Sequence, residues 1–523
     1  MENWNGTDRH HFNAIVTDQD LVETYLPAFQ ACVQDGGVAS VMCSYNEVNG
    51  VPSCANGLLL NQVLRDEWGF NGHVVGDCGA ISDILDTHHY TTSLDSTVQA
   101  ALRGGTDLDC GLFYQLYSMD AYNHGFINDQ DLDLAMTRLF TQRMKLGMFD
   151  PPDIQPYFNI SSSQVNTAAS QALALEAARE GIVLLKNDGK LCARTLPLTA
   201  NKIALIGPNS EATVTMQGNY YGSPPFLISP LQGLTTLGVS VVWAQGCDVA
   251  CTGSTGFAAA IAAAKQGEVV VVVVGLNQTQ ESEGNDRTEI TLPGLQLQLL
   301  AAIRNATMSP LVVVLMSGGP VDMSWAKGAN ANALLWVGYP GQSGGQAIAE
   351  VLYGKVNPSG RLPYTMYPGD YVTQVSMFNM TMRGPPGRTY KFYTGASVYP
   401  FGYGLSYTTF SYEWTGDQFK SDHRVSHLAS EFAVNYQVTV TNMGKISGAV
   451  SVLAFVTSDV PGAPLQQLFG FQKVMLDPGA SADLFFAVTH TSFMTVDEQG
   501  HKTLHRGNYW VHIEDLKHHV MVE

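Results

Sequence analysis

Short apolar runs alternate with stretches of helical spacing in the N-terminal region of the chain. The runs at 38–43 and 73–77 have the pattern of strands, and 56–68 and 97–103 indicate helices. A third short strand is predicted at 106–110. This order is typical of a parallel sheet or barrel, whose active site lies at the carboxyl ends of the strands. Polar residues gather at those ends: Ser44, Tyr45, Asn46, Asp77 and Asp109.

The number of strand–helix units limits what this region can be. About three units fit into residues 1–150, whereas a (β/α)₈ barrel needs eight units and about 250 residues. Three units alone would leave open sheet edges. We therefore expect residues 1–150 to be the C-terminal part of a barrel whose N-terminal half is absent from this chain.

A second α/β region is predicted at 168–367, after a linker at 151–167. Strands are expected at 203–207, 269–274 and 311–315. The run at 269–274 consists of valines, which is the pattern of a strand buried on both faces of a parallel sheet, and it is too short to cross a bilayer. Helices are expected at 258–265 and 295–303.

The pattern changes again toward the C-terminus. A connecting segment rich in Gly, Pro, Tyr and Thr is expected at 368–408. Short alternating strands, such as 433–440, are separated by turn sequences at 442–444 and 477–479. They predict a β-sandwich of immunoglobulin size at 409–523. The predicted fold class is α/β multidomain.

Composition narrows the classes of partner and site. The formal charge of −19 and the pI near 5.0 argue against a nucleic-acid partner and suit a neutral substrate. The eight cysteines include no C-x-x-C pair, so a zinc site is not expected, and their even number permits disulfides. N-x-S/T sequons, like disulfides, suit a secreted protein, although the N-terminus has no apolar signal region. The candidate glycosylation sites are Asn5, Asn159, Asn277, Asn305 and Asn379.

Two carboxylate positions are candidates for chemistry. Asp77 ends a predicted strand between glycines, where it could act as a nucleophile or base, or else cap the following helix. The acidic loop 281–287 follows the valine strand, where ligands of open α/β sheets bind, but its pattern alone favours a solvated surface loop. Glycoside cleavage requires one ionised and one protonated carboxyl group, so loops from different domains would have to meet.

Several histidines are assigned no catalytic role. His88 and His89, with Tyr90, follow Asp77 by one helical stretch and are interpreted as a helix cap. His10 and His11 lie near the start of the chain and receive no role.

A series of collinear motifs extends over essentially the whole chain. The first are MCSYN at 42–46, VVGDCGA at 74–80 and GTDLDCG at 105–111. Further motifs are EGNDR at 283–287, LPG at 292–294, GYPGQ at 338–342, RTY at 388–390 and YPFGYGLSY at 399–407. Together they resemble family 3 glycoside hydrolases, with the greatest likeness to the β-xylosidase branch of plants and fungi.

The resemblance implies a barrel, an α/β sandwich and a fibronectin type III-like domain. It implies that Asp77 is the nucleophile and Glu283 the acid/base, with Glu281 the alternative if the loop alignment slips by two residues. Tyr45 and Met42 are expected beside the substrate. No cofactor or metal is implied.

The cysteines lead to an expectation about sugar specificity. Xylosidases of the family resemble this chain in having a cysteine, Cys78, after the nucleophile, similarly bridged to Cys110. Such a bridge would crowd a hydroxymethyl group but not the bare C5 of xylose. Cys43–Cys54 and Cys247–Cys251 are further expected bridges, and the partners of Cys32 and Cys192 stay open.

The resulting expectation is a secreted, retaining exo-β-1,4-xylosidase that releases xylose from xylo-oligosaccharides. An α-L-arabinofuranosidase or bifunctional pentosidase is one alternative, and an inactive carbohydrate-binding remnant is another. The family's Lys-His segment is expected just before the Glu-Asn-Trp-Asn-Gly start of this chain, so an N-terminal truncation that also removed a signal peptide is expected.

Overall fold

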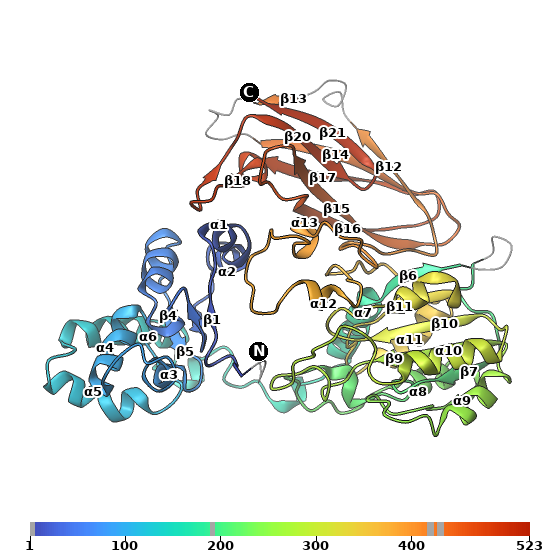
Figure 1. Cartoon of the computed structure of the whole chain (residues 1–523), viewed down its shortest axis with the longest axis horizontal. Helices are drawn as coiled ribbons and strands as arrows, with labels where there is room; N and C mark the ends of the chain where they lie inside the picture. Colours follow the sequence, from blue (N-terminus) through green and yellow to red (C-terminus); the bar gives the residue numbers. More distant parts are fainter. Residues whose placement is uncertain (1–5, 189–193, 416–422, 426–432) are drawn as a thin grey trace. The chain divides into compact units, whose positions relative to one another are not determined.

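A computed structural model describes residues 6–188, 194–415, 423–425 and 433–523. The chain divides into two compact units. Unit 1 comprises Met1–Ser162, Ser376–Met382 and Val496–His501, and unit 2 comprises Ser163–Val375, Arg383–Thr495 and Lys502–Glu523 (Figure 1). The sequon at Asn5 and the open cysteine Cys192 lie outside the described residues.

Unit 1 is built around two parallel strands, β2 (Ser40–Cys43) and β5 (His73–Gly76), which pair from Ser40↔His73 to Cys43↔Gly76. The helix predicted between them forms as a π-helix, η3 (Leu58–Glu67). The hydrophobic core of unit 1 contains the fully buried residues Val74, Ile81, Ile84, Val98 and Ala101. The helices after β5 are α3 (Ala80–Asp86), α4 (Leu94–Gly104), α5 (Phe113–Asn123) and α6 (Asp129–Lys145) (Figure 1).

The strand predicted at 106–110 is wrong. This segment joins β5 through one isolated parallel bridge, Val75↔Leu108, in which Gly76 N donates to Leu108 O at 2.8 Å. The side chains explain the short pairing, because Thr106 and Asp107 turn inward and are buried. Thr106 Oγ1 donates to the carbonyl of Cys54 at 2.7 Å.

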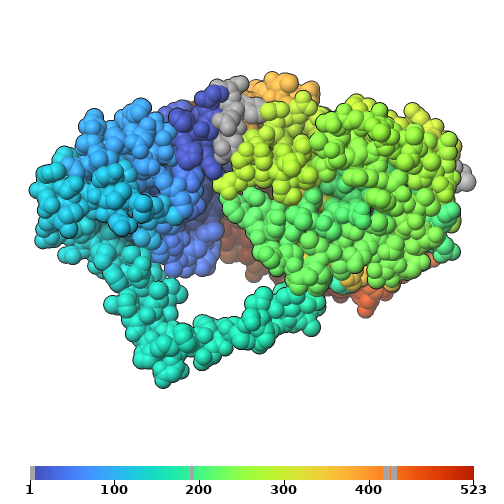
Figure 2. Space-filling model, turned by 90° about the horizontal axis from the view of Figure 1, so that it is seen from below, coloured from blue at the N-terminus to red at the C-terminus, as the bar shows by residue number. Residues whose placement is uncertain are grey.

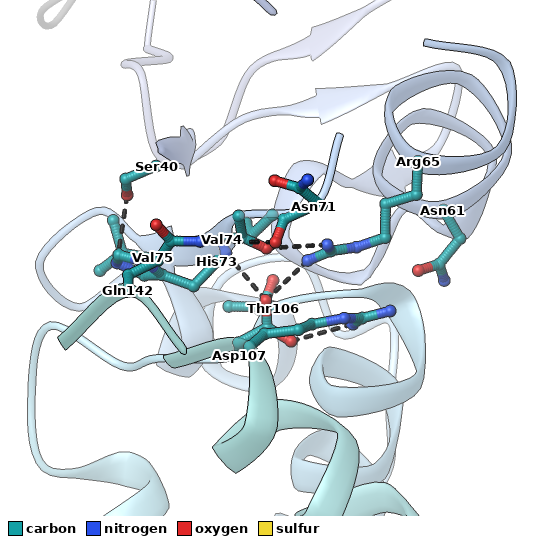
Figure 3. Close-up of polar contacts among 12 residues, drawn as sticks. Ser40, Asn61, Arg65, Asn71, His73, Val74, Val75, Thr106, Asp107 and Gln142 are labelled. Carbon is teal, nitrogen blue, oxygen red and sulfur yellow. Dashed lines mark hydrogen bonds and ion pairs between the residues drawn. The ribbon is translucent and has the colours of Figure 1, made fainter. Parts of the chain in front are cut away.

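Asp107 instead anchors the start of β5 (Figure 3). Its Oδ2 accepts from Arg65 Nη2 at 2.7 Å and from the backbone N–H of Val74 at 2.8 Å. Its Oδ1 accepts from Arg138 Nη1 at 3.0 Å. The Asp107 side chain is 2% exposed, so this carboxylate is a buried ion pair with two guanidinium groups. Burial lowers the pKa of Arg65, and the neighbouring Asp107 opposes that shift.

Two segments distant in sequence complete unit 1. The hydroxyl of Tyr25 donates to Met380 O at 2.8 Å, and the N–H of Met382 donates to the buried carboxylate of Asp20 at 3.0 Å. Gln19 Nε2 donates to Val496 O at 2.5 Å. These residues extend an N-terminal region made of β1 (Asn13–Ala14), α1 (Asp18–Asp20), η1 (Leu21–Tyr25), α2 (Pro27–Gln34), β3 (Glu47–Val48), β4 (Val51–Pro52) and η2 (Ser53–Ala55).

The segment after α6 is a narrow arm, drawn in teal in Figure 2. It contains only the short 3₁₀ turns η4 (Pro152–Ile154) and η5 (Ser162–Gln164). Its apolar side chains are exposed, among them Tyr157 and Phe158. A chain with so few buried contacts fits the linker interpretation of this region.

The first part of unit 2 is a six-stranded sheet in the order β6-β11-β10-β9-β7-β8, in which β6 alone runs antiparallel to its neighbour. Every residue of β9 is buried, which confirms the prediction from the valine run. Helices cover both faces: α7 (Ala168–Gly181), α8 (Pro230–Thr236) and α11 (Gly344–Leu352) pack together, as do α9 (Phe257–Ala264) and α10 (Gln296–Ala306). The strands are β6 (Val183–Asn187), β7 (Lys202–Ile206), β8 (Ser240–Ala244), β9 (Val269–Gly275), β10 (Leu311–Met316) and β11 (Ala333–Trp336).

Two sheets follow the connecting segment, which itself contains the short helices α12 (Tyr371–Gln374) and α13 (Thr389–Phe392). Their strands pair antiparallel except β13, which runs parallel to β21. The strand orders are β12-β14-β17 and β13-β21-β20-β15-β16. Alternate residues of β14 are buried, as the sequence predicted. The strands are β12 (Phe410–Thr415), β13 (His423–Val425), β14 (Ala433–Asn442), β15 (Gly448–Ser458), β16 (Gln467–Leu476), β17 (Ser481–Thr489), β20 (Gly507–Ile513) and β21 (Leu516–Val522).

The predicted fold class, α/β multidomain with a β-sandwich, is confirmed. Within the described ranges, no helix has both the length and the apolarity needed to span a membrane.

Candidate active site

Asp77 follows the last residue of β5, where the backbone turns into α3. Its N–H donates to Cys43 O at 3.0 Å, and its carbonyl accepts from Ala80 N at 2.9 Å. One carboxylate oxygen, Oδ1, accepts from the N–H of Cys78 at 2.7 Å. The N-cap of α3 is Gly79, which has φ +87° and no side-chain cap. The alternative interpretation of Asp77 as a helix cap is therefore wrong.

Disulfides join the chain segments on either side of Asp77. Cys43 ends β2, and the carbonyl of Cys110 accepts from Gly79 N at 2.8 Å. Cys43 is bridged to Cys54 in η2, and Cys78 is bridged to Cys110, so the residue after Asp77 is covalently tied to the segment 106–110. Cys32 is exposed and forms no disulfide with the part of the chain described. The three disulfides are the pairs expected from the sequence: Cys43–Cys54, Cys78–Cys110 and Cys247–Cys251.

Two basic side chains lie close to the ring of Tyr45. The ring centroid of His10 lies 4.3 Å from that of Tyr45, and the guanidinium carbon of Arg9 lies 5.2 Å from it. His10 Nδ1 lies within hydrogen-bonding distance, 2.7 Å, of Asp83 Oδ2, and Asp83 belongs to α3. His10 received no role from the sequence, because nothing in its local pattern indicates contact with residues 35 and 73 positions away.

His88 and His89 differ in a way that the sequence did not reveal. His89 Nδ1 lies 3.0 Å from Leu85 O at the end of α3, as expected for a cap. His88 is instead almost fully buried, with Nε2 at 2.8 Å from Tyr45 O and Nδ1 at 3.8 Å from Glu47. The cap interpretation is wrong for His88, which fixes the backbone of Tyr45. Tyr90 is exposed.

The other predicted strand-end residues have structural partners or a solvent-facing side chain. Ser44 Oγ donates to Asn46 Oδ1 at 2.9 Å and to Ser53 at 3.1 Å. Asp109 Oδ2 accepts from Tyr114 N at 3.2 Å in the first turn of α5. The side chain of Met42 on β2 is exposed.

In unit 2, five loops leave one edge of the sheet, because β7, β8, β9, β10 and β11 are parallel and share their carboxyl ends. Ligands of open α/β sheets bind at this edge. The loop after β9 carries both candidate carboxylates, Glu281 and Glu283. A polar cavity of about 330 Å³ adjoins this loop, lined among others by Gln280, Asn285, Asp286 and Arg287.

Glu281 is tied to the neighbouring loops through both carboxylate oxygens. Oε1 accepts from the Tyr339 hydroxyl at 2.7 Å and from Gly318 N at 2.6 Å. Oε2 lies 3.1 Å from Arg287 Nη2. Burial, followed by the charge of Glu281, raises the pKa of Tyr339, so this hydroxyl keeps its proton and stays a donor. These contacts make Glu281 an anchor for its loop.

Glu283 differs from Glu281 in exposure and partners. It lies at the exposed tip of the same loop, where Oε2 accepts a hydrogen bond from the hydroxyl of Tyr220. Tyr220 was not singled out in the sequence, and Tyr339 entered only as part of the GYPGQ motif, although tyrosines that follow parallel strands would have been a usable signal.

The predicted sequons fall in varied surroundings. Asn159 lies in the arm, Asn305 in α10 and Asn379 in the segment that belongs to unit 1, and all three are exposed. Asn277 is half-buried, and its Oδ1 accepts from Thr279 N at 3.0 Å.

Comparison with known proteins identifies the class. Residues 5–141 match the profile of the glycosyl hydrolase family 3 N terminal domain, and residues 182–407 match that of its C-terminal domain. Residues 451–516 match a fibronectin type III-like domain. The matches place the chain among enzymes that hydrolyse glycosides. The chain belongs to glycosyl hydrolase family 3, which confirms the resemblance seen in the motifs.

Several similar proteins are named as xylosidases. The chain is 41% identical to β-D-xylosidase 1 of Arabidopsis thaliana, over 100% of this chain and 71% of that protein. It is 42% identical to β-xylosidase/α-L-arabinofuranosidase 2 of Medicago sativa subsp. varia, over 100% of this chain and 70% of that protein. A solved GH3 exo-β-xylosidase (XlnD), in complex with a xylobiose aziridine probe, matches with TM-score 0.92 and 37% identity, over 100% of this chain and 70% of that one.

Proposed function

We propose that this protein is a retaining exo-β-xylosidase that removes terminal β-1,4-linked xylose from xylo-oligosaccharides. The observation that carries the proposal is the bridged cysteine next to Asp77, in a chain 41% identical to a plant β-D-xylosidase. For comparison, a β-glucosidase structure from Erythrobacter marinus is only 27% identical over 98% of this chain.

Asp77 is proposed as the nucleophile. Its carboxylate attacks the anomeric carbon as the glycosidic bond breaks, forming a covalent glycosyl-enzyme. The hydrogen bond from Cys78 N to Oδ1 fixes the orientation of the carboxylate. The disulfides at Cys43 and Cys78 hold the strand ends in place, so the nucleophile is positioned before substrate binds.

Glu283 is proposed as the acid/base. It first protonates the leaving oxygen and then accepts a proton from the water that hydrolyses the glycosyl-enzyme. The reaction requires its carboxyl group to come about 5–5.5 Å from that of Asp77. The contacts within unit 2 favour Glu283 over Glu281, because an acid/base needs an oxygen that can reach the substrate, and both oxygens of Glu281 are engaged.

Sugar specificity is proposed to come from the Cys78–Cys110 bridge. Cys78 is exposed immediately after the nucleophile, so the bridge occupies space beside the sugar ring. A glucoside carries a hydroxymethyl group at C5 that a xyloside lacks, and this group would collide with the bridge. Tyr45 and Met42 are proposed to contact the same sugar.

Hydrolysis of a set of aryl glycosides tests the function. We expect turnover of aryl β-xyloside with initial release of β-xylose, the product of retention seen by NMR, and little turnover of aryl β-glucoside. Release of α-xylose, or preference for the glucoside, would contradict the proposal. Absence of turnover on every glycoside would support the binding remnant instead.

A second activity, α-L-arabinofuranosidase, is suggested by the relatives from Medicago sativa subsp. varia, which are named for both activities and are 42% and 41% identical. Both substrates are pentosides and lack C6; the xyloside holds C5 within a six-membered ring, and the arabinofuranoside carries C5 outside a five-membered ring. Aryl α-L-arabinofuranoside in the same assay distinguishes a bifunctional enzyme from a xylosidase.

Replacing Glu283 with alanine is expected to separate the two steps of the reaction. Hydrolysis of xylobiose should fall by roughly 10²- to 10⁴-fold, because its leaving group needs protonation. Hydrolysis of 2,4-dinitrophenyl xyloside should be slowed at deglycosylation, and added azide should restore its rate and yield xylosyl azide. Glu281→Ala is the matched comparison: azide rescue in that variant instead of Glu283→Ala would assign the acid/base to Glu281.

Secretion is proposed from the three disulfides, which persist in oxidising compartments. Protein recovered from the medium of a eukaryotic host is expected to lose mass on treatment with an endoglycosidase, through glycans at exposed sequons such as Asn379. Unglycosylated protein confined to the cytosol would contradict this proposal.

A further inference from the structure

We propose that Tyr220 is a positioning residue for the acid/base: its hydroxyl holds one oxygen of Glu283, so that the other is presented to the leaving group. This inference rests on the proposed function, because it assigns a role within the same reaction. Tyr220 lies outside the motifs that identified the family, and its contact with Glu283 is visible only in the fold.

Sheet topology brings Tyr220 and Glu283 together although they are 63 residues apart in the sequence. Tyr220 lies in the loop after β7, and Glu283 lies in the loop after β9. These strands are parallel neighbours, paired from Ile203↔Val269 to Ile206↔Val272. Their carboxyl ends therefore meet at one edge, and loops leaving adjacent strands can exchange side-chain contacts.

Two further contacts fasten the loops to each other near this hydrogen bond. Gln278 Nε2, at the base of the β9 loop, donates to Thr215 O in the β7 loop at 3.0 Å. Gly218 lies so close to the ring of Tyr339 that a Cβ at Gly218 would be 3.4 Å from it. Tyr339 in turn anchors Glu281 at 2.7 Å. The bond between Gln278 and Thr215 joins the two loops that carry Glu283 and Tyr220.

The backbone of Tyr220 indicates that its placement has a reason other than burial. Its φ is +53°, in the left-handed region that a bulky residue rarely adopts. Its side chain is 82% exposed, so core packing does not explain this conformation. Strained residues persist where the fold holds them, and they cluster at functional sites. The hydrogen bond to Glu283 supplies a function for the strained position.

The chemistry gives the two carboxyl oxygens of Glu283 different tasks. In the first step the proton on Oε1 moves to the leaving-group oxygen as its bond to the anomeric carbon breaks and the bond to Asp77 forms. Oε2, which accepts from Tyr220, then shares the negative charge of the carboxylate. In the second step Oε1 takes a proton from water as the water oxygen bonds to the anomeric carbon and the bond to Asp77 breaks. Tyr220 keeps its proton throughout.

The test compares Tyr220→Phe with Tyr221→Phe, which removes the hydroxyl of the adjacent, half-exposed tyrosine. Each variant is assayed with xylobiose and with 2,4-dinitrophenyl β-xyloside. For Tyr220→Phe we expect kcat/KM on xylobiose to fall roughly 10- to 100-fold, the value of a hydrogen bond to a charged group. Because dinitrophenolate leaves without protonation, its glycosylation rate should change less than about threefold. Tyr221→Phe should leave the rates on both substrates unchanged.

The outcomes separate this inference from the proposed function. Equal losses on both substrates, no loss on xylobiose, or an equal effect of Tyr221→Phe would overturn the role of Tyr220. Glu283→Ala in the same assay reports on the acid/base itself. If Glu283→Ala shows the dependence on the leaving group and Tyr220→Phe does not, only the positioning role fails. If Glu283→Ala does not show it, the proposed function fails first.

Discussion

Replacing Asp77 with asparagine is expected to lower the hydrolysis of aryl xyloside by roughly 10⁴-fold or more, as the loss of a covalent catalyst does. Asparagine has nearly the same shape, and its amide oxygen can still accept from Cys78 N, a bond of 2.7 Å in the structure. The loss should therefore come from chemistry and not from unfolding. Initial rates, with the thermal unfolding midpoint measured alongside, check this expectation.

A trapping experiment identifies the nucleophile directly. A 2-fluoro-xyloside with a good leaving group should form a stable adduct on the peptide that contains Asp77, seen as a mass increase, and Asp77→Asn should stay unlabelled. Asp86→Asn is the matched control, because Asp86 is an exposed residue at the end of α3. Labelling of another carboxylate, or near-normal activity of Asp77→Asn, would remove Asp77 from the reaction.

The second large effect concerns the stability of unit 1. Replacing Asp107 with alanine is expected to destabilise this unit by roughly 3–5 kcal/mol, the cost of removing one partner from a buried ion pair. The change leaves the guanidinium groups of Arg65 and Arg138 without their carboxylate, and it removes the acceptor of Val74 N (Figure 3). The start of β5 loses its anchor as a result.

Asp131→Ala provides the comparison for Asp107→Ala. Asp131 also pairs with an arginine, at 3.0 Å, and accepts from Asn128 N in the capping box of α6, but the Arg103 side chain is 48% exposed, so the loss should stay below about 2 kcal/mol. Denaturant unfolding followed by fluorescence and by residual activity measures both variants. If the two variants unfold at the same denaturant concentration, the buried network does not stabilise β5 as we infer.

Much of the fold could be predicted because its signals are local. The valines of β9 and the alternation in β14 each report burial directly, and both predictions are confirmed. The segment 106–110 misled the prediction because its apolar and polar residues fit a strand, whereas its side-chain partners, Cys54 and Arg65, lie more than 40 positions away. Local pattern does not report such distant competition for hydrogen bonds.

The candidate site likewise contains residues that the local sequence indicates and residues whose role depends on distant contacts. Asp77 was indicated by its place at a strand end, whereas Glu283 was preferred over Glu281, two positions away in the same loop, only through the family resemblance. The difference lies in partners from other loops, since Tyr339 and Gly318 engage Glu281. His10 was missed for the same reason, because its contacts with Tyr45 and Asp83 are made by folding alone.

The short segment Val496–His501 limits where the chain can be truncated. It lies within the fibronectin-like stretch of the sequence, yet it is part of unit 1, where Gly500 packs against Asp18 and Val22. Expression of the first 408 residues alone would therefore remove part of unit 1, the unit that contains Asp77. The fibronectin-like region is therefore not a separable domain. Its deletion is expected to disturb the folding of unit 1, which contains Asp77.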